Sequence, residues 1–370
     1  MLITTEQELN ELMQTASQAT AVALDTEFVW ERTFYPALGL IQMAIGRDCY
    51  LIDPLAIKDM SALGDLIANP KVIKILHDAQ QDLTILKSAT GATPVNIFDS
   101  RLAYGFCCDE STLSLAKLVE AILGITLDKS ATRTNWLQRP LDQQQLIYAA
   151  DDVKYLTEVM DYILTQAEKN NTKHWLLEEM TIYANPELYT EIAPSEYYRK
   201  IRNTDRLKSQ QLAILRELAS WRETVARKLD RPRGHIIHNN TLIDMAYRAP
   251  CNIKALKGIN RLSPRAVDSY GKAMIDCIAK ASKMPVDKLP MIAPKFAKKS
   301  DAKLIISVIE AKATAMGLDP ALLCTRKEIN NILINPAKHA DKARIFKGWR
   351  HEFMQEIYQS SEVAALMGIG

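Results

Sequence analysis

Residues 21–28 read Ala-Val-Ala-Leu-Asp-Thr-Glu-Phe, an apolar run that ends in two carboxylates. Four apolar residues in a row, followed by polar ones, are typical of a buried β-strand. Side chains two residues apart on a strand share one face of the sheet, so we expect Asp25 and Glu27 to point the same way. An Asp-x-Glu triplet is common by chance, so its meaning depends on acidic residues elsewhere in the chain.

Two later stretches place acidic side chains where they can meet this pair. Residues 77–82 read His-Asp-Ala-Gln-Gln-Asp, and Asp82 opens a helical pattern after the apolar run 72–76. Tyr148 and Asp152 lie four residues apart in Tyr-Ala-Ala-Asp-Asp, so they share one face of a helix. Each stretch alone has an ordinary explanation, such as pairing of Asp82 with the helix dipole. Their order along the chain favours one shared site.

A buried cluster of carboxylates requires cations. Like charges about 4 Å apart repel by roughly 4 kcal/mol at an effective dielectric constant of about 20. Two divalent ions would neutralise four carboxylates, and hard oxygen ligands suit Mg²⁺ or Mn²⁺. The sequence therefore predicts a two-metal site of the kind that hydrolyses phosphodiesters. The predicted metal ligands are Asp25, Glu27, Asp82 and Asp152, and Tyr148 completes the predicted catalytic set.

Apolar runs and helical patterns alternate in the first half of the chain. The predicted strands are 21–24, 39–45, 50–52, 72–76 and 95–98. Short turns join the first three, which favours antiparallel pairing, whereas helices separate the later ones, as parallel crossovers require. One helix is predicted at 111–123 and another from Asp142 to about 166, opened by a capping box with Gln145. The predicted fold class is α/β, a mixed sheet with flanking helices.

The second half of the chain is predicted to be helical. At 370 residues the chain is too long for one typical domain. Helical periodicity covers 210–229, 239–246, 253–256 and 264–281, and again 301–316, 326–333 and 343–359. Three prolines between these groups indicate a linker. The predicted divisions are a nuclease domain at 1–167, a connector at 168–206, a helical domain at 207–284, a linker at 285–297 and a second helical domain at 298–370.

The net charge of +2 conceals a strong asymmetry between the two halves. Residues 1–200 hold 16 Lys and Arg against 28 Asp and Glu, whereas residues 201–370 hold 30 against 16. A basic half indicates a polyanionic partner, and the alternative is a solvated surface on ordinary helices. The basic residues that we expect to contact phosphates are Arg216, Arg222, Arg227, Lys228, Arg231, Arg233, Lys254, Lys257, Arg261 and Arg265.

The compartment is expected to be the cytoplasm. The six cysteines contain no Cys-x-x-Cys pair, so we expect neither a zinc site nor a disulfide framework. The N-terminal residues show no basic segment followed by an apolar run, and no apolar stretch is long enough to span a membrane. We expect a monomer without a membrane partner.

The three acidic stretches resemble the motifs of the DEDD superfamily of 3′–5′ exonucleases, in the subgroup whose third motif carries a tyrosine. Asp25 and Glu27 match the first motif, Asp82 the second, and Tyr148 with Asp152 the third. Further segments resemble the ribonuclease D family. They are the flanks 32–42, 127–130 and 136–141, the end of a first HRDC domain at 257–271, and a second, degenerate HRDC domain from about 298.

The resemblance implies a ribonuclease H-like nuclease domain followed by all-α HRDC domains. It also implies hydrolysis of RNA from the 3′ end, release of nucleoside 5′-monophosphates, and precursor tRNA 3′ ends as substrate. Tyr148 would orient the attacking water, because a phenol with a pKa of about 10 is a poor general base. Phe28 matches a family position that stacks on a terminal base.

Several neighbouring residues are set aside. Asp151 points about 100° away from Asp152 around the helix, so it is left out of the metal shell. His77 is interpreted as structural, although a related subgroup uses a histidine, and Asp78 and Asp99 match no motif position. Trp30 is interpreted as either packing or stacking.

Other functional classes remain as alternatives. One is a DNA-directed 3′–5′ exonuclease of the same superfamily, and another is a non-catalytic RNA-binding module. A helicase that carries HRDC domains is excluded, because the chain contains no Gly-x-x-x-x-Gly-Lys-Ser/Thr phosphate loop.

Overall fold

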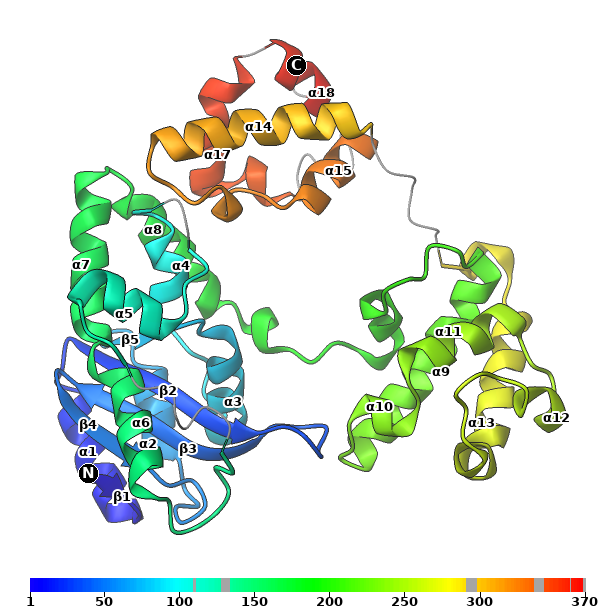
Figure 1. The fold of residues 1–370 in the computed structure, drawn as a ribbon, viewed down its shortest axis with the longest axis horizontal. Helices are drawn as coiled ribbons and strands as arrows, with labels where there is room; N and C mark the ends of the chain where they lie inside the picture. The colour runs from blue at the N-terminus through cyan, green and yellow to red at the C-terminus, as the bar shows by residue number, and fades with distance from the viewer. Residues whose placement is uncertain (109–110, 128–133, 291–297, 336–342, 360, 369–370) are drawn as a thin grey trace. The chain divides into compact units, whose positions relative to one another are not determined.

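The central sheet is built around β2 (Ala21–Val29), whose apolar first half is fully buried. The six strands lie in the order β1-β4-β3-β2-β5-β6. β3 and β4 pair antiparallel, whereas β2 pairs parallel with β5 and β5 with β6 (Figure 1). This mixed sheet confirms the predicted fold class. The other strands are β1 (Leu2–Ile3), β3 (Ala37–Ile45), β4 (Asp48–Ile52), β5 (Ile73–Leu76) and β6 (Ile97–Asp99).

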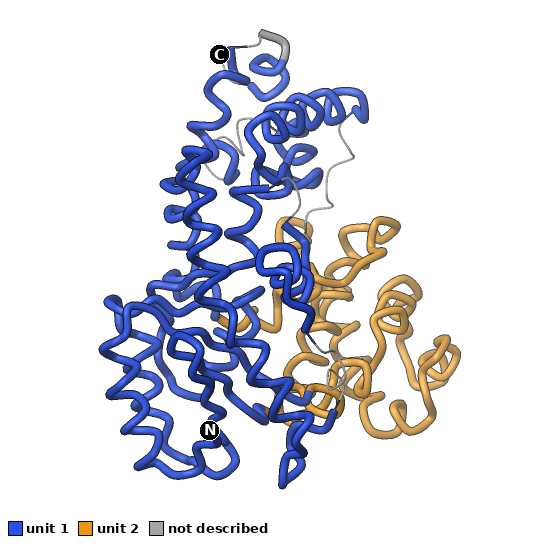
Figure 2. The backbone as a smooth tube through the Cα atoms, turned by 60° about the vertical axis from the view of Figure 1, so that its left-hand side comes forward, with its two compact units in different colours: residues 1–29, 38–189, 295–370 blue, residues 30–37, 190–294 orange. Residues whose placement is uncertain are grey.

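The chain divides into two units (Figure 2). Unit 1 comprises residues 1–29, 38–189 and 295–370, and unit 2 comprises residues 30–37 and 190–294. The computed structural model describes residues 1–108, 111–127, 134–290, 298–335, 343–359 and 361–368, so most of the flank 127–130 lies outside the described residues. Among the described residues, no helix has the length and apolar character that a membrane span needs.

Helices pack against the sheet within unit 1. They are α1 (Glu6–Ala16), α2 (Ser61–Ile67), α3 (Gln80–Thr90), α4 (Ser100–Tyr104), α5 (Leu115–Leu123), α6 (Gln143–Lys154), α7 (Leu156–Lys169) and α8 (Lys173–Met180). Asp142 caps α6 with the predicted capping box to Gln145. The prediction of a single helix from Asp142 to about 166 is wrong, because α6 ends before Tyr155 and α7 begins after it. Neither Gly nor Pro lies at this boundary to indicate it. The helix predicted from 111 begins only at Leu115.

The C-terminal helices belong to the same unit as the sheet. They are α14 (Lys299–Ala315), α15 (Arg326–Ile334), α17 (Gly348–Tyr358) and α18 (Ser361–Met367). Trp349 of α17 packs against Phe106 and Trp175, with ring centroids 5.0 and 5.7 Å away. The helix predicted at 343–359 begins at Gly348, because residues 344–346 form a separate 3₁₀ turn. One continuous apolar core thus joins the sheet to the C-terminal helices.

Unit 2 is a helical bundle with its own apolar core. Its helices are α9 (Ser209–Lys228), α10 (Arg233–Ile236), α11 (Asn239–Arg248), α12 (Ile253–Leu256) and α13 (Pro264–Ser282). Residues 30–37 belong to it because Phe34 is buried there beneath the Arg233 guanidinium, 4.3 Å from the ring centroid. The Asp230 carboxylate accepts the backbone N–H groups of Phe34 and Tyr35 at 2.9 and 3.1 Å.

Candidate active site

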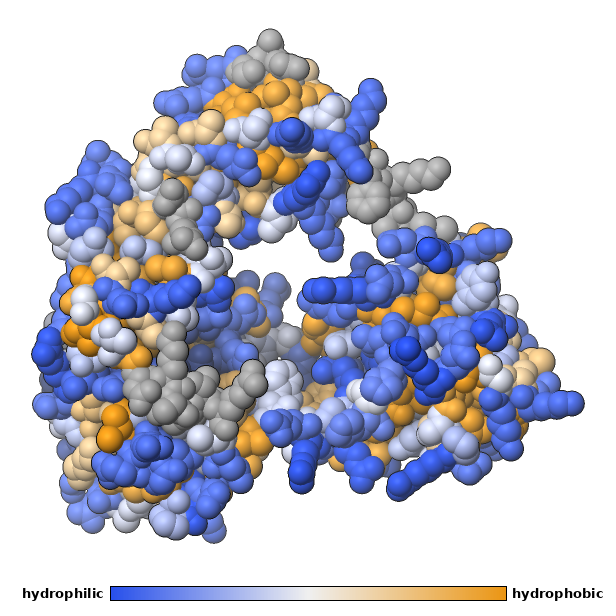
Figure 3. All heavy atoms as spheres, viewed as in Figure 1, coloured by the Kyte–Doolittle hydropathy of each residue, from blue (hydrophilic) through white to orange (hydrophobic). Residues whose placement is uncertain are grey.

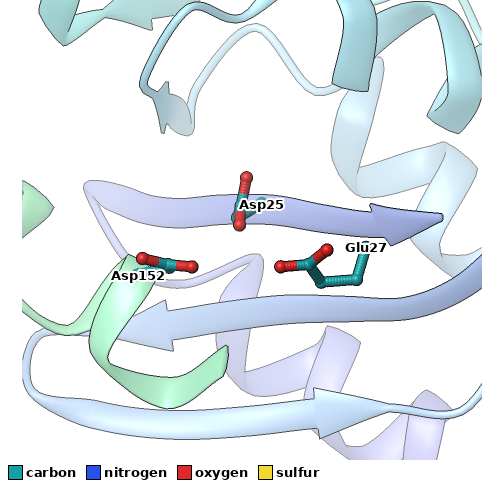
Figure 4. A group of neighbouring side chains, drawn as sticks. All are labelled: Asp25, Glu27 and Asp152. Carbon is teal, nitrogen blue, oxygen red and sulfur yellow. The ribbon is translucent and has the colours of Figure 1, made fainter. Parts of the chain in front are cut away.

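Strand β2 and helix α6 bring three carboxylates together. One oxygen from each of Asp25, Glu27 and Asp152 lies within 4.8 Å of the others. Figure 4 shows the Glu27 and Asp152 carboxylates turned toward each other, with Asp25 beside them. Asp25 and Glu27 share one face of β2, as two-residue spacing on a strand requires. Two segments that are far apart in the chain therefore contribute to one cluster.

Helix α6 supplies Tyr148 together with Asp152. Ala149 and Val153 are fully buried, which orients the helix and leaves the Tyr148–Asp152 edge partly open. The Tyr148 hydroxyl lies close enough to the Asp152 carboxylate for each group to shift the pKa of the other. The four-residue spacing thus forms an interacting pair on one helical face.

Asp82 lies beside the cluster, in the first turn of α3 and only 9% exposed. Its carboxylate accepts a hydrogen bond from the hydroxyl of Thr26, the residue between Asp25 and Glu27 on β2. Asp82 is close enough that its charge raises the pKa of Asp25. The three acidic stretches therefore meet, although Asp82 stands outside the tightest group of three. Thr26 was not predicted, because a threonine within a strand gives no signal of a distant partner.

Burial raises the pKa of every carboxyl in this cluster. It raises the pKa of Glu27 to about 8, that of Asp152 to about 7 and that of Asp82 to about 6. For Asp25, burial and then the charges of Asp82, Asp152 and Glu27 raise the pKa well above its ordinary value. Near neutral pH the cluster retains protons unless cations replace them.

The donor set fits a divalent metal. Carboxylate oxygens are the ligands that hard divalent cations prefer, and the raised pKa values show that the site favours added positive charge. Burial, followed by the charge of Asp152, also raises the pKa of the Tyr148 phenol. That phenol stays protonated at neutral pH, so it can donate hydrogen bonds.

His77 has structural partners on both ring nitrogens. Nδ1 lies 3.0 Å from the Ser100 hydroxyl oxygen, and Nε2 lies 3.1 Å from the Leu113 carbonyl oxygen. This geometry supports the interpretation of His77 as a structural residue. Asp78 is largely exposed and pairs with Arg101.

Asp99 has a supporting function that its sequence context did not reveal. It is buried and accepts the backbone N–H groups of Asp78 and Ala79 at 3.0 and 2.9 Å, and the Tyr183 hydroxyl at 2.5 Å. Asp78 has a left-handed backbone, with φ of 62°, immediately before the helix that carries Asp82. Asp99 therefore stabilises the turn that starts this helix. In the sequence, a signal that could have pointed to this supporting function is the position of Asp99 at the end of an apolar strand.

The aromatic residues after the first motif differ in exposure. Phe28 is partly buried at the end of β2, and its stacking role stays a prediction. Trp30 is 49% exposed, and its indole N–H donates to the Phe34 carbonyl at 2.8 Å. The Trp30 side chain is therefore not part of an apolar core.

Comparisons with known proteins assign the chain to a family. A family model described as 3′-5′ exonuclease matches residues 1–168, and an HRDC domain model matches residues 211–278. The chain is 42% identical over 366 residues to ribonuclease D of Desulfotalea psychrophila, with 97% of both chains covered. The chain belongs to the ribonuclease D family. It is 33% identical to the ribonuclease D of Escherichia coli strain K12, with 96% of both chains covered.

A solved structure supports the same assignment. The crystal structure of Escherichia coli RNase D, described as an exoribonuclease involved in structured RNA processing, has a TM-score of 0.88 and 31% identity. The match covers 100% of this chain and 98% of that chain. This ribonuclease D family member is therefore a 3′–5′ exoribonuclease, and its acidic cluster is a divalent-metal site. The predicted family, fold class and enzyme class are confirmed.

Proposed function

We propose that this chain trims precursor tRNA at the 3′ end and releases nucleoside 5′-monophosphates. The observation that carries the proposal is the meeting of Asp25, Glu27 and Asp152 within 4.8 Å, with Asp82 beside them. The whole set of motif residues comes from one chain, which favours a functional monomer. A cytoplasmic location belongs to the same proposal, because the substrate is an RNA precursor.

Asp25, Glu27, Asp82 and Asp152 would hold two divalent ions, Mg²⁺ or Mn²⁺. Ions held in this way supply an activated water and stabilise charge on the phosphate and on the leaving 3′ oxygen. Tyr148 would orient the attacking water through its hydroxyl, which already contacts Asp152. Phe28 would stack on the terminal base.

The basic helical half would hold the body of the RNA. Hydrophilic side chains cover most of the visible face of α9–α13 (Figure 3). Four of the ten predicted basic residues are poorly placed to contact phosphates. Arg222 is only 1% exposed, Arg227 and Arg233 pair with the buried carboxylate of Glu223, and Arg216 is half-buried beside Glu217. The exposed basic residues that remain are Lys228, Arg231, Lys254, Lys257, Arg261 and Arg265.

Product analysis tests this proposal. The chain is incubated with a 3′-extended tRNA and Mg²⁺, with the same RNA and EDTA, and with single-stranded DNA of matched length. We expect stepwise release of 5′-monophosphates from the RNA, none in EDTA, and much slower release from DNA. Equal rates on DNA and RNA would favour a DNA-directed exonuclease. Activity that persists after complete chelation would overturn the metal assignment.

RNA binding by unit 2 has a separate test. Lys254 and Lys257 are changed together to alanine, and RNA affinity is measured as a function of salt. We expect weaker binding and a slope of log affinity against log salt that is smaller by about 1 for each phosphate that is no longer neutralised. Lys169, an exposed lysine at the end of α7, is the matched control. An unchanged slope would show that Lys254 and Lys257 do not neutralise phosphates of the RNA.

A further inference from the structure

Residues 134–141, which read Thr-Asn-Trp-Leu-Gln-Arg-Pro-Leu, directly precede α6, and the proposed reaction gives them no role. We propose that this segment, the strap, is a positioning element for Tyr148. Trp136 is its positioning residue, and Arg139 fixes the strap to the sheet. The inference rests on the proposed role of the Tyr148 hydroxyl, and it adds residues that match none of the three acidic motifs.

The strap approaches β3 closely at Gly39. A Cβ atom on residue 39 would lie 2.7 Å from the Trp136 carbonyl oxygen and 2.8 Å from the Trp136 Cβ. Such distances are shorter than van der Waals contact, so only glycine permits this approach. Trp136 is consequently held against the sheet and is only 2% exposed.

Arg139 fixes the strap through hydrogen bonds from all three of its guanidinium nitrogens. Nε and Nη2 donate to the two carboxylate oxygens of the buried Asp53 at 2.6 and 2.7 Å. Nη2 also donates to the Gly39 carbonyl at 2.7 Å. Nη1 donates to the carbonyls of Trp136 and Gln138 at 2.9 and 2.8 Å. A lysine has no planar fork, so it cannot reproduce this set of bonds.

The strap then contacts the helix that carries the catalytic pair. The Trp136 and Tyr148 rings lie 6.1 Å apart between centroids, with 36° between their planes. Both rings join a small apolar cluster that also contains Leu40 and Ala149. At the start of the strap, the Gln145 side-chain amide donates to the Thr134 hydroxyl at 3.0 Å. The Tyr148 ring is thus held by Trp136, while its hydroxyl lies beside Asp152.

The geometry assigns two separate contributions to Tyr148. The hydroxyl orients the attacking water, and the strap determines where the hydroxyl lies. Misplacement of a catalytic group by about 1 Å can cost on the order of 100-fold in rate. Loss of the Trp136 ring should therefore lower kcat without a comparable change in KM, because RNA binding does not depend on this contact.

A double-mutant cycle on the full chain tests the inference. We expect Trp136→Leu to lower kcat about tenfold and to change KM less than about twofold, and Trp136→Phe to recover most of the rate. In the Tyr148→Phe background, where the hydroxyl is already gone, Trp136→Leu should cost less than about twofold. A full tenfold loss in that background would overturn the inference, because a purely structural tryptophan gives additive effects.

Further variants keep the test decisive. If Trp136→Leu does not fold, Arg139→Lys enters the same cycle, and Arg47→Lys is its control because Arg47 forms only an exposed ion pair with Glu158. If Tyr148→Phe leaves kcat unchanged, the proposed role of Tyr148 fails and the strap inference fails with it. If Tyr148→Phe lowers kcat and the cycle is additive, only the strap inference fails.

Discussion

Unit 1 buries carboxylates in two places, and the pKa values of the carboxyls at these two places are shifted in opposite directions. At Glu179, which is 4% exposed, the Arg350 guanidinium donates to both carboxylate oxygens at 2.6 and 2.7 Å, and the Trp349 indole adds a third bond at 2.7 Å. At the active site, Asp25 and Glu27 face Asp152, and the neighbouring charges that shift the pKa values of Asp25 and Glu27 all belong to carboxylates. Burial acts in the same direction at both places. Burial alone would raise the pKa of each carboxyl. Of these carboxyls, Glu179 has a guanidinium partner, Arg350, which outweighs burial and lowers the pKa.

The difference separates a carboxylate buried for stability from carboxylates buried for function. Charge pairing within the chain satisfies Glu179, so its pKa is lowered. The active-site carboxyls have raised pKa values, so a cation from outside the chain would stabilise their charged forms. Substitutions at the two places should therefore affect different measurements.

Asp25→Asn should have the largest effect on activity. Removal of the central carboxylate should lower kcat by on the order of 1000-fold, because the site loses a ligand that no other residue replaces. RNA affinity should stay within about threefold of wild type. Release of nucleotides from a 3′-tailed RNA in Mg²⁺ checks the rate, and filter binding checks the affinity. Glu168→Gln, at an exposed ion pair with Lys173, is the control, and a wild-type rate for Asp25→Asn would refute the two-metal site.

Arg350→Met should have the largest effect on stability. It leaves Glu179 buried without its cation, which costs about 3–5 kcal/mol of unfolding free energy. Urea denaturation measures this cost, with Arg47→Met as the exposed control. The folded fraction should retain its kcat. A loss below about 1 kcal/mol would show that the pair is solvated, and the comparison between the two sites would then fail.

The two places should also give opposite dependences on pH. The lowered pKa of Glu179 contributes stability that is present above its ordinary value of 4.5 and is lost as pH falls through the folded pKa. The raised pKa values of Asp152 and Glu27, about 7 and about 8, mean that the metal-free protein loses stability as pH rises from about 4 to 8.

Thermal unfolding in EDTA across this pH range measures both effects. Asp25→Asn should flatten the decline between pH 6 and 8, and Glu179→Gln should flatten the decline below pH 4.5. Added Mg²⁺ should stabilise the wild type more at pH 8 than at pH 6, because metal binding releases protons. Equal stabilisation at both pH values would contradict the raised pKa values.

Tyr148→Phe should lower activity less than Asp25→Asn does. It removes the hydroxyl beside Asp152 that would orient the attacking water, so we expect kcat to fall about 10- to 100-fold while unfolding free energy changes by less than about 1 kcal/mol. Trp349→Phe removes the neutral donor to Glu179 and should change stability without changing kcat. Single-turnover rates and urea denaturation of both variants provide the comparison. If Tyr148→Phe lowers the free energy of unfolding more than Trp349→Phe does, the proposed difference between the two buried sites is contradicted.

Local patterns predicted much of the framework for this site. The apolar run before Asp25, the capping box at Asp142 and the four-residue spacing of Tyr148 and Asp152 are all short-range signals, and the structure contains them. The meeting of the three acidic stretches depended on resemblance to a known family, because periodicity within an element says nothing about its distant neighbours.

The remaining features could not be read from the sequence for the same physical reason. Glu179 and Arg350 are 171 residues apart, and neither lies in a motif. The approach of Trp136 to Gly39 depends on backbone atoms of two separate segments. The helix break at Tyr155 has no Gly or Pro to indicate it, so tertiary packing determines where the helix ends.

The discontinuity of unit 1 has a consequence for how the chain is made. Glu179 obtains its paired guanidinium from Arg350, 171 residues later, and the Ser111 backbone N–H donates to the Asp319 carboxylate 208 residues later. At about 5–20 residues per second, roughly 10–30 s of translation separate Glu179 from Arg350. The polypeptide of unit 2 is complete before the ribosome reaches α17. During that interval the apolar surface around Trp175 lacks the contacts that Trp349 and Phe353 of α17 later provide, so it is exposed to aggregation.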